Sequence, residues 1–573
     1  MISFDAVGVS YADTSDDRDA SGHGAPGGSA GGAGTTETTD TTVFSGATFR
    51  VPEGELVLVV GPTGSGKSTL LRCINGLVPH FSGGTLHGTV TVAGRDTRTH
   101  RPRDLADLVG FVVQDPLSSF VTDTVEEEIA YGMEALGVDA TSMRRRVEET
   151  LDLLGLADVR GRPLRDLSGG QQQRVAIGAV LAAGPRILVL DEPTSALDPV
   201  AAEDVLATLH RLVHDLGITV VVAEHRLERV IHHADHVVLI GDGRVSGLLD
   251  PADAMVTSPI YPPIIGLGRA LRWSPLPLSI RDARRRASEV RESLALLPAP
   301  SPTPARPAAL DGELPEGLDG AAVARVDGLS VRRGSVVALR SVSVAVAPGE
   351  VVAVMGRNGA GKSTLLSALV GQLRPSAGTV RLGPLDPSGA RPAEVVRRAG
   401  MVPQDPSLIL YAESVAGECT AADRDFGLPR GTTAGVLRRI VPDVDAEQHP
   451  RDLSEGQRVS LALAVILASE PDVVLLDEPT RGLDYAAKRR LVALLQQLAA
   501  TGHAVVLATH DVELAAEVAT RVVVLAEGEV VADGSAASVL PGSPAFAPQV
   551  SKILHPLHFL TVDQVVAATG AAS

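Results

Sequence analysis

The sequence predicts two α/β domains of the same fold in tandem, each built on a mostly parallel sheet. The 573 residues are too many for one compact core, and 44% of them are apolar. Short β-branched runs such as ELVLVV before Gly61 alternate with segments of helical length and spacing such as QQRVAIGAVLAA. A set of motifs also occurs twice in the same order. Duplication of one α/β domain accounts for all three observations.

The internal repeat pairs four motifs along the chain. Corresponding motifs are 285 to 295 residues apart. The segments that begin at Ser258 and Ser543 are also similar and lie 285 residues apart, so the repeated unit includes a C-terminal tail. The paired motifs are GPTGSGKST at Gly61 and GRNGAGKST at Gly356, LSGGQ at Leu167 and LSEGQ at Leu453, LVLDEPTSALD at Leu188 and VLLDEPTRGLD at Val474, and AEHR at Ala223 and ATHD at Ala508.

Two segments of unusual composition interrupt the repeat. A stretch rich in Gly, Ser, Thr and Asp predicts a disordered surface insertion, and a Pro- and Ala-rich stretch predicts a semi-rigid tether between the halves. The predicted parts are a first domain at 1–257 with the insertion at 13–42, its tail at 258–295, the linker at 296–322, a second domain at 323–540 and its tail at 541–573.

The bulk composition excludes several functional classes. The formal net charge of -18 argues against nonspecific binding of nucleic acid, which depends on Lys and Arg. No window holds the roughly 18 to 20 uncharged apolar residues that cross a bilayer, and the acidic start does not resemble a signal peptide. Cys73 and Cys419 cannot form a disulfide framework and belong to no spaced Cys/His cluster. We therefore expect a cytoplasmic protein.

Two glycine-rich loops predict phosphate binding. The segments 61–68 and 356–363 fit the pattern G-x-x-x-x-G-K-[ST], each directly after an apolar run and before a helical one. The glycines let the backbone wrap a phosphate chain and direct N–H groups at it, at the positive end of the following helix. The lysines should reach the β- and γ-phosphates, and the serines would place a hydroxyl on Mg²⁺. These residues are Lys67, Ser68, Lys362 and Ser363.

Two pairs of acidic residues follow apolar strands. Asp191 and Asp477 end buried strands, where a carboxylate is costly unless a cation such as Mg²⁺ compensates its charge. The next residues, Glu192 and Glu478, are candidates to polarise an attacking water as general bases. The sequence therefore predicts a hydrolytic site beside each phosphate loop.

The phosphate loops, the LSGGQ and LSEGQ motifs, the LDEPT motifs and the histidines after the next strand together resemble the ATP-binding-cassette (ABC) family over nearly the whole chain. The resemblance implies an ATPase that binds ATP and Mg²⁺ through two tandem P-loop ABC-type nucleotide-binding domains. Each domain would have a mostly parallel sheet core, an antiparallel β subdomain and a helical subdomain. In that family two cassettes pair head to tail, so each nucleotide would lie between the phosphate loop of one half and the LSGGQ-type motif of the other.

The resemblance also implies roles for individual residues. The catalytic residues would be Glu192 and Glu478 with the switch histidines His225 and His510. One nucleotide would contact Tyr11, Gly61, Pro62, Thr63, Gly64, Ser65, Gly66, Lys67, Ser68, Thr69, Gln114, Asp191, Ser454, Glu455, Gly456 and Gln457. The other would contact Gly356, Arg357, Asn358, Gly359, Ala360, Gly361, Lys362, Ser363, Thr364, Gln404, Asp477, Ser168, Gly169, Gly170 and Gln171. The Mg²⁺ ligands would be Ser68, Gln114, Ser363 and Gln404, and the loops of Asp198 and Asp484 would cross the interface of the paired cassettes.

Two positions depart from the family pattern. Glu455 stands where the signature motif usually has glycine, and a carboxylate there would slow or weaken the site that uses the first phosphate loop. Tyr11 fits the aromatic residue that stacks on adenine, but the matching position in the second half is Arg333. The planar guanidinium can stack on a base, and a solvated loop residue fits the sequence equally well.

Both tails carry apolar side chains at helical spacing. They predict either a cap on each domain's own core or a contact between the two tails, and the sequence leaves both open. The residues are Ile264, Ile265, Leu267 and Leu271 in the first tail and Val550, Ile553, Leu554 and Leu557 in the second.

The run HHADH contains three histidines, His232, His233 and His236. No cysteine or carboxylate accompanies them at the spacing of metal ligands. We expect a solvated helix end there and assign it no metal.

Within the ABC family, the segment VGFVVQDPLSSFVTDTVEEEIAYGMEALGV from Val109 and the two tails resemble the ATPases of the energy-coupling-factor (ECF) group, which import vitamins and trace metals. This resemblance implies two partners, a transmembrane coupling subunit and a membrane substrate-binding subunit. It implies a peripheral protein at the cytoplasmic face of the cell membrane, with no nucleic-acid partner. The two halves would pair within one chain.

Two other functions are compatible with parts of the sequence. One is a soluble two-cassette ATPase acting on ribosomes or DNA, although the linker is Pro-rich rather than highly charged and zinc cysteines are absent. The other is a fused ATPase of a sugar or peptide importer. Sugar-type fusions often have a degraded second phosphate loop, whereas the loop at 356–364 is complete.

Overall fold

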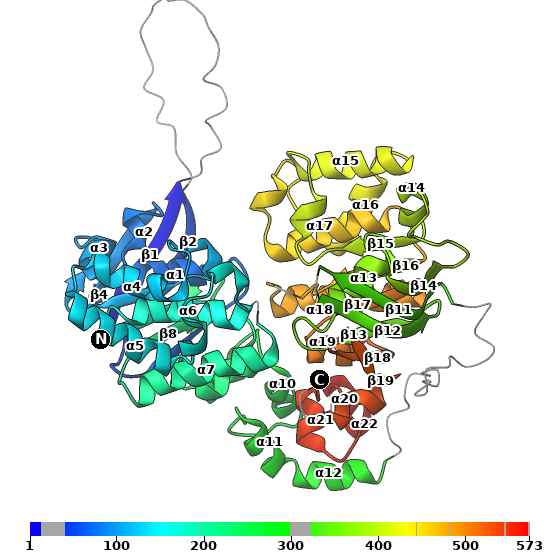
Figure 1. The fold of residues 1–573 in the computed structure, drawn as a ribbon. Coiled ribbons are helices and arrows are strands. Elements are labelled where there is room, and N and C mark those ends of the chain that lie inside the picture. Colours follow the sequence, from blue (N-terminus) through cyan, green and yellow to red (C-terminus); the bar gives the residue numbers. More distant parts are fainter. Residues whose placement is uncertain are drawn as a thin grey trace, which may run out of the picture. The chain divides into compact units, whose positions relative to one another are not determined.

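The computed structural model describes residues 1–12, 40–297 and 322–570, except Ala196, Ser335, Asp443, Arg481, Pro544 and Ala545. The chain divides into two compact units, Met1–Pro259 and Ile260–Ser573 (Figure 1). The insertion predicted at 13–42 lies outside the described residues except at 40–42. Those three residues begin a strand, because they pair with the first strand of the chain, so the predicted end of the insertion is wrong. Most of the linker predicted at 296–322 also lies outside the described residues.

The first unit is built on a ten-stranded sheet in the order β5-β4-β1-β2-β10-β9-β3-β8-β7-β6. The strands from β9 to β6 are parallel, and every residue of β3, β7 and β8 is buried, as their uninterrupted apolar sequences predict. The strands are β1 (Ile2–Ala12), β2 (Asp40–Val51), β3 (Leu56–Val60), β4 (Thr85–Val92), β5 (Arg95–Asp96), β6 (Val109–Val112), β7 (Ile187–Asp191), β8 (Thr219–Ala223), β9 (His236–Gly241) and β10 (Arg244–Val245).

Several helices of the first unit position the site. Helices α4, α5 and α6 pack on one another as a helical subdomain, whereas α1 packs on β7 and β8 of the parallel sheet. The helices are α1 (Lys67–Ile74), α2 (Leu77–His80), α3 (Pro102–Leu105), α4 (Val125–Ala135), α5 (Ala140–Leu153), α6 (Gly169–Leu181), α7 (Pro199–His214), α8 (Leu227–Val230) and α9 (Pro251–Thr257), with 3₁₀ turns at Pro116–Ser118, Ala157–Val159, Leu164–Asp166 and Ile231–His233.

The second unit repeats this architecture with two sheets. A six-stranded sheet runs in the order β15-β16-β17-β13-β18-β19, parallel except for β19, and a three-stranded antiparallel sheet runs in the order β12-β11-β14. The strands are β11 (Ala324–Arg333), β12 (Val336–Val346), β13 (Val351–Met355), β14 (Ala377–Leu382), β15 (Ala399–Val402), β16 (Val473–Asp477), β17 (Ala504–Ala508), β18 (Arg521–Ala526) and β19 (Glu529–Ser535).

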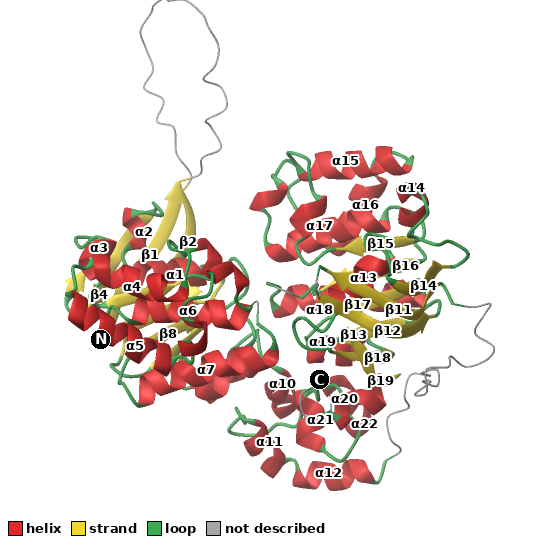
Figure 2. Ribbon diagram, viewed as in Figure 1, coloured by secondary structure: helices red, strands yellow, loops and turns green. Residues whose placement is uncertain are grey.

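Helices α15, α16 and α17 form the helical subdomain of the second unit and lie to one side of its strands (Figure 2). The helices of this unit are α10 (Pro263–Ala270), α11 (Ile280–Arg286), α12 (Ser288–Ala295), α13 (Lys362–Leu369), α14 (Pro392–Val396), α15 (Val415–Phe426), α16 (Thr432–Ile440), α17 (Glu455–Leu467), α18 (Tyr485–Ala500), α19 (Val512–Val518), α20 (Ala536–Gly542), α21 (Gln549–Leu554) and α22 (Val562–Thr569), with 3₁₀ turns at Pro406–Ile409 and Pro450–Asp452.

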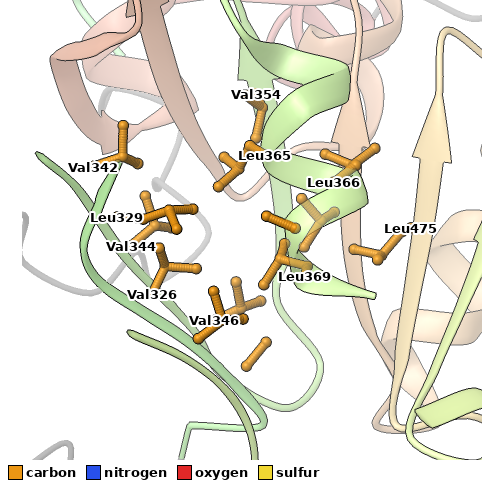
Figure 3. Close-up of a cluster of buried hydrophobic side chains, with 14 of the residues drawn as sticks. Val326, Leu329, Val342, Val344, Val346, Val354, Leu365, Leu366, Leu369 and Leu475 are labelled. Atoms are coloured by element: carbon orange, nitrogen blue, oxygen red, sulfur yellow. The ribbon is translucent and has the colours of Figure 1, made fainter. Parts of the chain in front are cut away.

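The core of the second cassette lies around helix α13. Figure 3 shows Leu365, Leu366 and Leu369 of this helix among valines of the antiparallel strands, with Val354 and Leu475 from the parallel sheet. Burying such side chains stabilises the fold by about 1.5 to 3 kcal/mol each. One apolar core thus holds both sheets and the helix that follows the phosphate loop.

The two tails contact each other within the second unit. Helices α10 and α11 of the first tail pack on α21, and α10 also packs on α22. The N–H of Ile264 donates to Gln549 Oε1 at 3.0 Å, and Arg291 Nη1 donates to the Ile553 carbonyl at 3.1 Å. The second tail also joins its own cassette, because the N–H of Gln549 donates to Glu513 Oε1 in α19 at 2.8 Å. The second tail therefore both packs on its own cassette and contacts the first tail, the two arrangements that the sequence left open. Helices α10 to α12 of the first tail belong to the second unit.

Candidate nucleotide-binding sites

The first phosphate loop connects β3 to α1 and closes on its own lysine. Lys67 Nζ donates to the carbonyls of Gly61 at 2.9 Å and Pro62 at 3.0 Å. Gly66 precedes α1 with a φ of 99° in the left-handed region, which favours glycine. A Cβ added to Gly61 would lie 2.2 Å from the Ile240 carbonyl oxygen. Glycine at both positions is thus required to bring the loop over the end of the sheet.

The second phosphate loop has the same geometry between β13 and α13. Lys362 Nζ donates to the carbonyl of Gly356 at 2.9 Å and lies 3.4 Å from that of Arg357. Gly361 has a φ of 105°, and a Cβ on Gly356 would lie 2.3 Å from the Leu525 carbonyl oxygen. Both loops therefore place backbone N–H groups at the start of an eight-residue helix, where an anion is stabilised.

The strand-end aspartates provide the acidic part of each site. Asp191 is 7% exposed and Asp477 is 4% exposed. Burial raises the pKa of both carboxyls, and the neighbouring hydroxyls of Ser68 and Ser363 partly offset this rise. Among the described residues, one oxygen of each aspartate, Oδ1, has no hydrogen-bond partner. A buried carboxylate beside a serine hydroxyl fits the hard oxygen ligands that Mg²⁺ prefers, so the residues present fit this cation.

Glu192 lies between a glutamine and a histidine in the first cassette. Gln114 Nε2 donates to Glu192 Oε2 at 2.9 Å, and His225 Nε2 lies 2.6 Å from Glu192 Oε1. Glu192 has a φ of 50°, which is disfavoured for a side-chain-bearing residue. Gln114 and His225, which belong to two other motifs, therefore both contact the Glu192 carboxylate.

Glu478 occupies the equivalent place with a different set of contacts. His510 Nδ1 lies 2.8 Å from Glu478 Oε2, and Lys362 Nζ lies 3.5 Å from Glu478 Oε1. Burial raises the pKa of Glu478, but the hydrogen bond and charge of His510 and the charge of Lys362 outweigh it, so the pKa lies below its usual value. Gln404 lines a small cavity with Glu478. The ionised form of Glu478 is thus favoured, as a general base requires.

The signature serines begin helices α6 and α17. Ser168 Oγ accepts the N–H of Gln171, and Ser454 Oγ accepts that of Gln457, each at 3.3 Å, while each glutamine side chain accepts the serine N–H at 3.0 Å. These are reciprocal capping boxes. Glu455 is the first residue of α17, and its carboxylate lies against Gly482, the residue two positions before Asp484.

Four further predicted residues are helix caps or lie at or next to strand ends. Asp198 and Asp484 cap α7 and α18, where their carboxylates accept the N–H groups of Ala201 and Ala487 at 2.9 and 2.8 Å. Tyr11, in β1, is partly buried and packs against the hydrophobic core of the first unit. Arg333 is the exposed last residue of β11.

The HHADH histidines have two further neighbours that the sequence did not indicate. The ring centroids of His210 and His233 lie 5.5 Å apart, and those of His210 and His214 lie 4.0 Å apart. His232 lies 4.0 Å from His233. The four rings thus form one cluster between α7 and the turn after α8, and the described residues contain no group of three or more arranged to hold a metal ion.

Sequence reasoning also missed Glu224 and Arg229, which contact the loop after Glu192. The available signal was the difference between AEHR in the first cassette and ATHD in the second. That difference places a carboxylate directly before His225 in the first cassette, whereas Thr509 precedes His510 in the second.

Comparison with known proteins decides the family. The family model described as ABC transporter matches residues 44–195 and again 339–481. The chain belongs to the ABC transporter family. Two matches to one model also agree with the tandem fold, so the predicted fold class of two P-loop ABC-type domains is confirmed.

Relatives of this ABC protein extend over nearly its whole length. It is 61% identical to an ABC transporter ATP-binding protein of Streptomyces coelicolor over 90% of this chain and 95% of the relative. It is 35% identical to one from Methanosarcina acetivorans, over 86% and 83% of the two chains. The archaeal ribosome recycling factor aABCE1 has a similar fold, with a TM-score of 0.55, 21% identity and coverage of 87% and 89%.

The family defines the chemistry of the two sites. The ABC protein is an ATPase, and its cofactors are ATP and Mg²⁺. No helix in the described part of the chain is long and apolar enough to cross a membrane.

Proposed function

We propose that this ATPase powers the import of a small substrate, of the vitamin or trace-metal class, through separate transmembrane subunits. The protein would act as a peripheral subunit at the cytoplasmic face of the membrane, with a coupling subunit and a substrate-binding subunit as partners. The ECF-like segment after Val109 and the tails are the sequence features that support this assignment.

The observation that carries the proposal is a pair of exposed apolar surfaces after the two glutamines. Leu117 and Val121 follow Gln114 and are 47% and 60% exposed, and Leu408 and Tyr411 follow Gln404 and are 61% and 82% exposed. Exposed apolar side chains gathered near a functional site are typical of docking surfaces. We propose that each surface receives a helix of the membrane subunit.

In this proposal each nucleotide lies between the phosphate loop of one cassette and the signature motif of the other. Mg²⁺ and ATP supply the electrophilic phosphorus, and the chain positions and activates the water. Glu192 and Glu478 would accept its proton, since each carboxylate is held by a histidine at 2.6 or 2.8 Å. ATP binding would bring the two halves together, and ATP hydrolysis would let them separate. This cycle would move the membrane subunits.

The catalytic assignment is tested by Glu192→Gln and Glu478→Gln separately. Each change is expected to lower steady-state ATP hydrolysis, because a general base contributes roughly 10² to 10⁴ in rate. The signature residue Glu455 predicts that the Glu192 site contributes the smaller share. Unchanged turnover in both variants would remove the base assignment.

The transport assignment is tested by Leu408→Asp with Tyr411→Asp in the full chain. These changes are expected to abolish co-purification with membrane proteins while ATP hydrolysis continues. The matched control is Val531→Asp, another exposed apolar position, at 57% exposure in β19. Mass spectrometry of small molecules trapped with the complex would identify the substrate. Co-purification with ribosomes or DNA would instead support the soluble alternative.

A further inference from the structure

Glu224 connects two catalytic segments of the first cassette. It directly follows β8 and is 2% exposed. Glu224 Oε1 accepts the N–H of Thr194 at 2.8 Å, and Oε2 accepts the N–H of His225 at 3.2 Å. Because each oxygen takes a different donor, one carboxylate joins the backbone two residues after Glu192 to the backbone of the switch histidine.

Arg229 in α8 holds the same loop from its carbonyl side. Arg229 Nη1 lies 3.5 Å from the carbonyl oxygen of Thr194 and 3.4 Å from that of Leu197. The next residue, Asp198, caps α7. The loop from Glu192 to Asp198 is thus held through N–H and C=O groups by two side chains that follow β8.

The second cassette makes the equivalent connection with other residues. Thr509 stands in place of Glu224, and Leu514 in place of Arg229. Lys488 Nζ of α18 instead donates to Asp511 Oδ1 at 2.9 Å, which ties the segment after the switch histidine to the helix capped by Asp484. The first cassette has Ala202 and Arg226 at the positions of Lys488 and Asp511, so it cannot form this ion pair.

The geometry of Glu192 explains why such a connection matters. Its φ of 50° is disfavoured for residues other than glycine, so the surrounding structure must hold it there. The N–H of Glu192 donates to the Ala223 carbonyl at 2.9 Å, and only Pro193 separates Glu192 from Thr194. Displacement of Thr194 would therefore move the Glu192 carboxylate relative to His225.

We propose that Glu224 and Arg229 are positioning residues that fix Glu192 against His225 in the first cassette, in the place of the Lys488–Asp511 pair of the second. The inference rests on the roles proposed above for Glu192 and His225. A buried carboxylate is costly unless its oxygens are paired, and here both oxygens accept backbone donors. These two hydrogen bonds offset part of the cost of burial and hold the backbone of Thr194 beside that of His225.

The test uses the full chain with Glu478→Gln, so that turnover comes from the Glu192 site. Adding Glu224→Thr and Arg229→Leu, the residues of the second cassette, is expected to lower kcat about 10- to 100-fold with less than about 3-fold change in KM for ATP, because misplacement of a catalytic group by about 1 Å costs this much. Glu224→Gln, which is isosteric, is expected to lower kcat in the same direction.

Rescue separates positioning from general stability. Adding Ala202→Lys and Arg226→Asp to the Glu224→Thr, Arg229→Leu variant transplants the ion pair of the second cassette and is expected to recover most of kcat. The control is Leu151→Ala, a fully buried change in α5, which is expected to lower the melting temperature with little effect on kcat.

The possible results distinguish this inference from the proposed function. If Glu192→Gln does not reduce turnover in the Glu478→Gln background, the base assignment fails. If Glu192→Gln abolishes turnover but Glu224→Gln and the Glu224→Thr, Arg229→Leu variant keep the parental kcat, the positioning role alone is overturned. If kcat falls in step with the melting temperature, to the same degree in Leu151→Ala as in the Glu224 and Arg229 variants, the positioning role is also overturned.

Discussion

The carboxylate of Glu455 lies against the backbone of Gly482, and a Cβ added to Gly482 would lie 2.2 Å from Glu455 Oε2. The first cassette has Gly169 and Ala196 at these two positions. The large side chain in the signature motif of the second cassette is therefore accompanied by the smallest residue in the loop it contacts. Glu455 also begins α17, where a negative charge is stabilised by the helix N-terminus.

Gly482→Ala is expected to destabilise the second unit by about 1 to 2 kcal/mol, which is the cost of a left-handed conformation, since Gly482 has a φ of 68°. The added Cβ also requires the flexible Glu455 side chain to move aside. Adding Glu455→Gly removes the side chain that has to move and should leave the conformational cost alone. Urea unfolding, followed by the alkylation of Cys419 as the second unit unfolds, measures the loss of stability in each variant.

A matched control for this prediction is Gly427→Ala. Gly427 has the same φ of 68° in the same unit, and its added Cβ would meet no atom within 4 Å. It therefore measures the conformational cost alone. Equal destabilisation by Gly427→Ala and Gly482→Ala would show that Glu455 moves aside at no measurable cost, and a loss below about 0.5 kcal/mol for both would contradict the conformational cost.

The histidine cluster of the first unit predicts a loss of stability at mildly acidic pH. Burial and the neighbouring histidines lower the pKa of His233 from 6.5 to about 4, and burial lowers that of His232, although Glu203 opposes this. Between pH 6.5 and 4 the unfolded chain binds protons that the folded cluster does not, so stability falls as the pH falls. The slope per histidine should be well below the limit of about 1.4 kcal/mol per pH unit, because the rings are partly exposed.

The urea midpoint of the first unit, measured between pH 7 and 5, checks this expectation. His232→Asn with His233→Asn should flatten the dependence, whereas the same change at His87, outside the cluster, should not. An identical slope in both variants would show that other groups dominate.

The two cysteines are expected to resist thiol reagents until their units unfold. Burial raises the pKa of Cys73 to about 12 and that of Cys419 to about 11, and neither side chain is more than 3% exposed. The thiolate is the reactive form, so labelling at pH 8 should be slow. Each unit contains one of the cysteines, and mass spectrometry of alkylated peptides would report their unfolding separately. Rapid labelling of the native protein would contradict the burial of these thiols.

The contact between the tails should keep the chain together after cleavage in the linker. With a protease site placed within 298–321, the fragments are expected to co-elute in size-exclusion chromatography without nucleotide, because Ile264, Ile265 and Ile553 are each no more than 1% exposed. Ile264→Asp should favour separation. Arg281→Ala, on the exposed side of α11, is the control, and separation of the unmodified fragments would refute the expectation.

The predictable part of the structure depends on short-range patterns. The apolar runs predict the buried parallel strands, and the loop motifs predict the lysines and serines at the helix starts, because strand, loop and helix are adjacent in the chain. Family resemblance assigns Gln114, Glu192 and His225 to one site but does not predict that Gln114 and His225 contact the Glu192 carboxylate, because the three residues are far apart in the sequence.

The unpredicted part depends on contacts between distant elements. In the sequence, Glu224 is simply a residue that follows a buried strand, and only the fold shows that it contacts Thr194. His210 and its neighbour His233 lie in different helical segments, so the sequence does not show that their rings are close. The apolar spacing in α10 predicts a buried face, but many surfaces could cover it. Its partner α21 follows only from the folded chain.

The packing of α10 to α12 with the second unit has a consequence for gene organisation. The Pro-rich segment 298–321 joins α12 to β11, which belong to the same unit, while the backbone passes between units at Pro259 and Ile260. Division of the reading frame within the Pro-rich segment would therefore yield two polypeptides, the first ending in three helices that recognise the second. We therefore expect the two halves to tolerate being fused or encoded separately when the junction lies within this segment. A junction at residue 259 is expected to disrupt the fold.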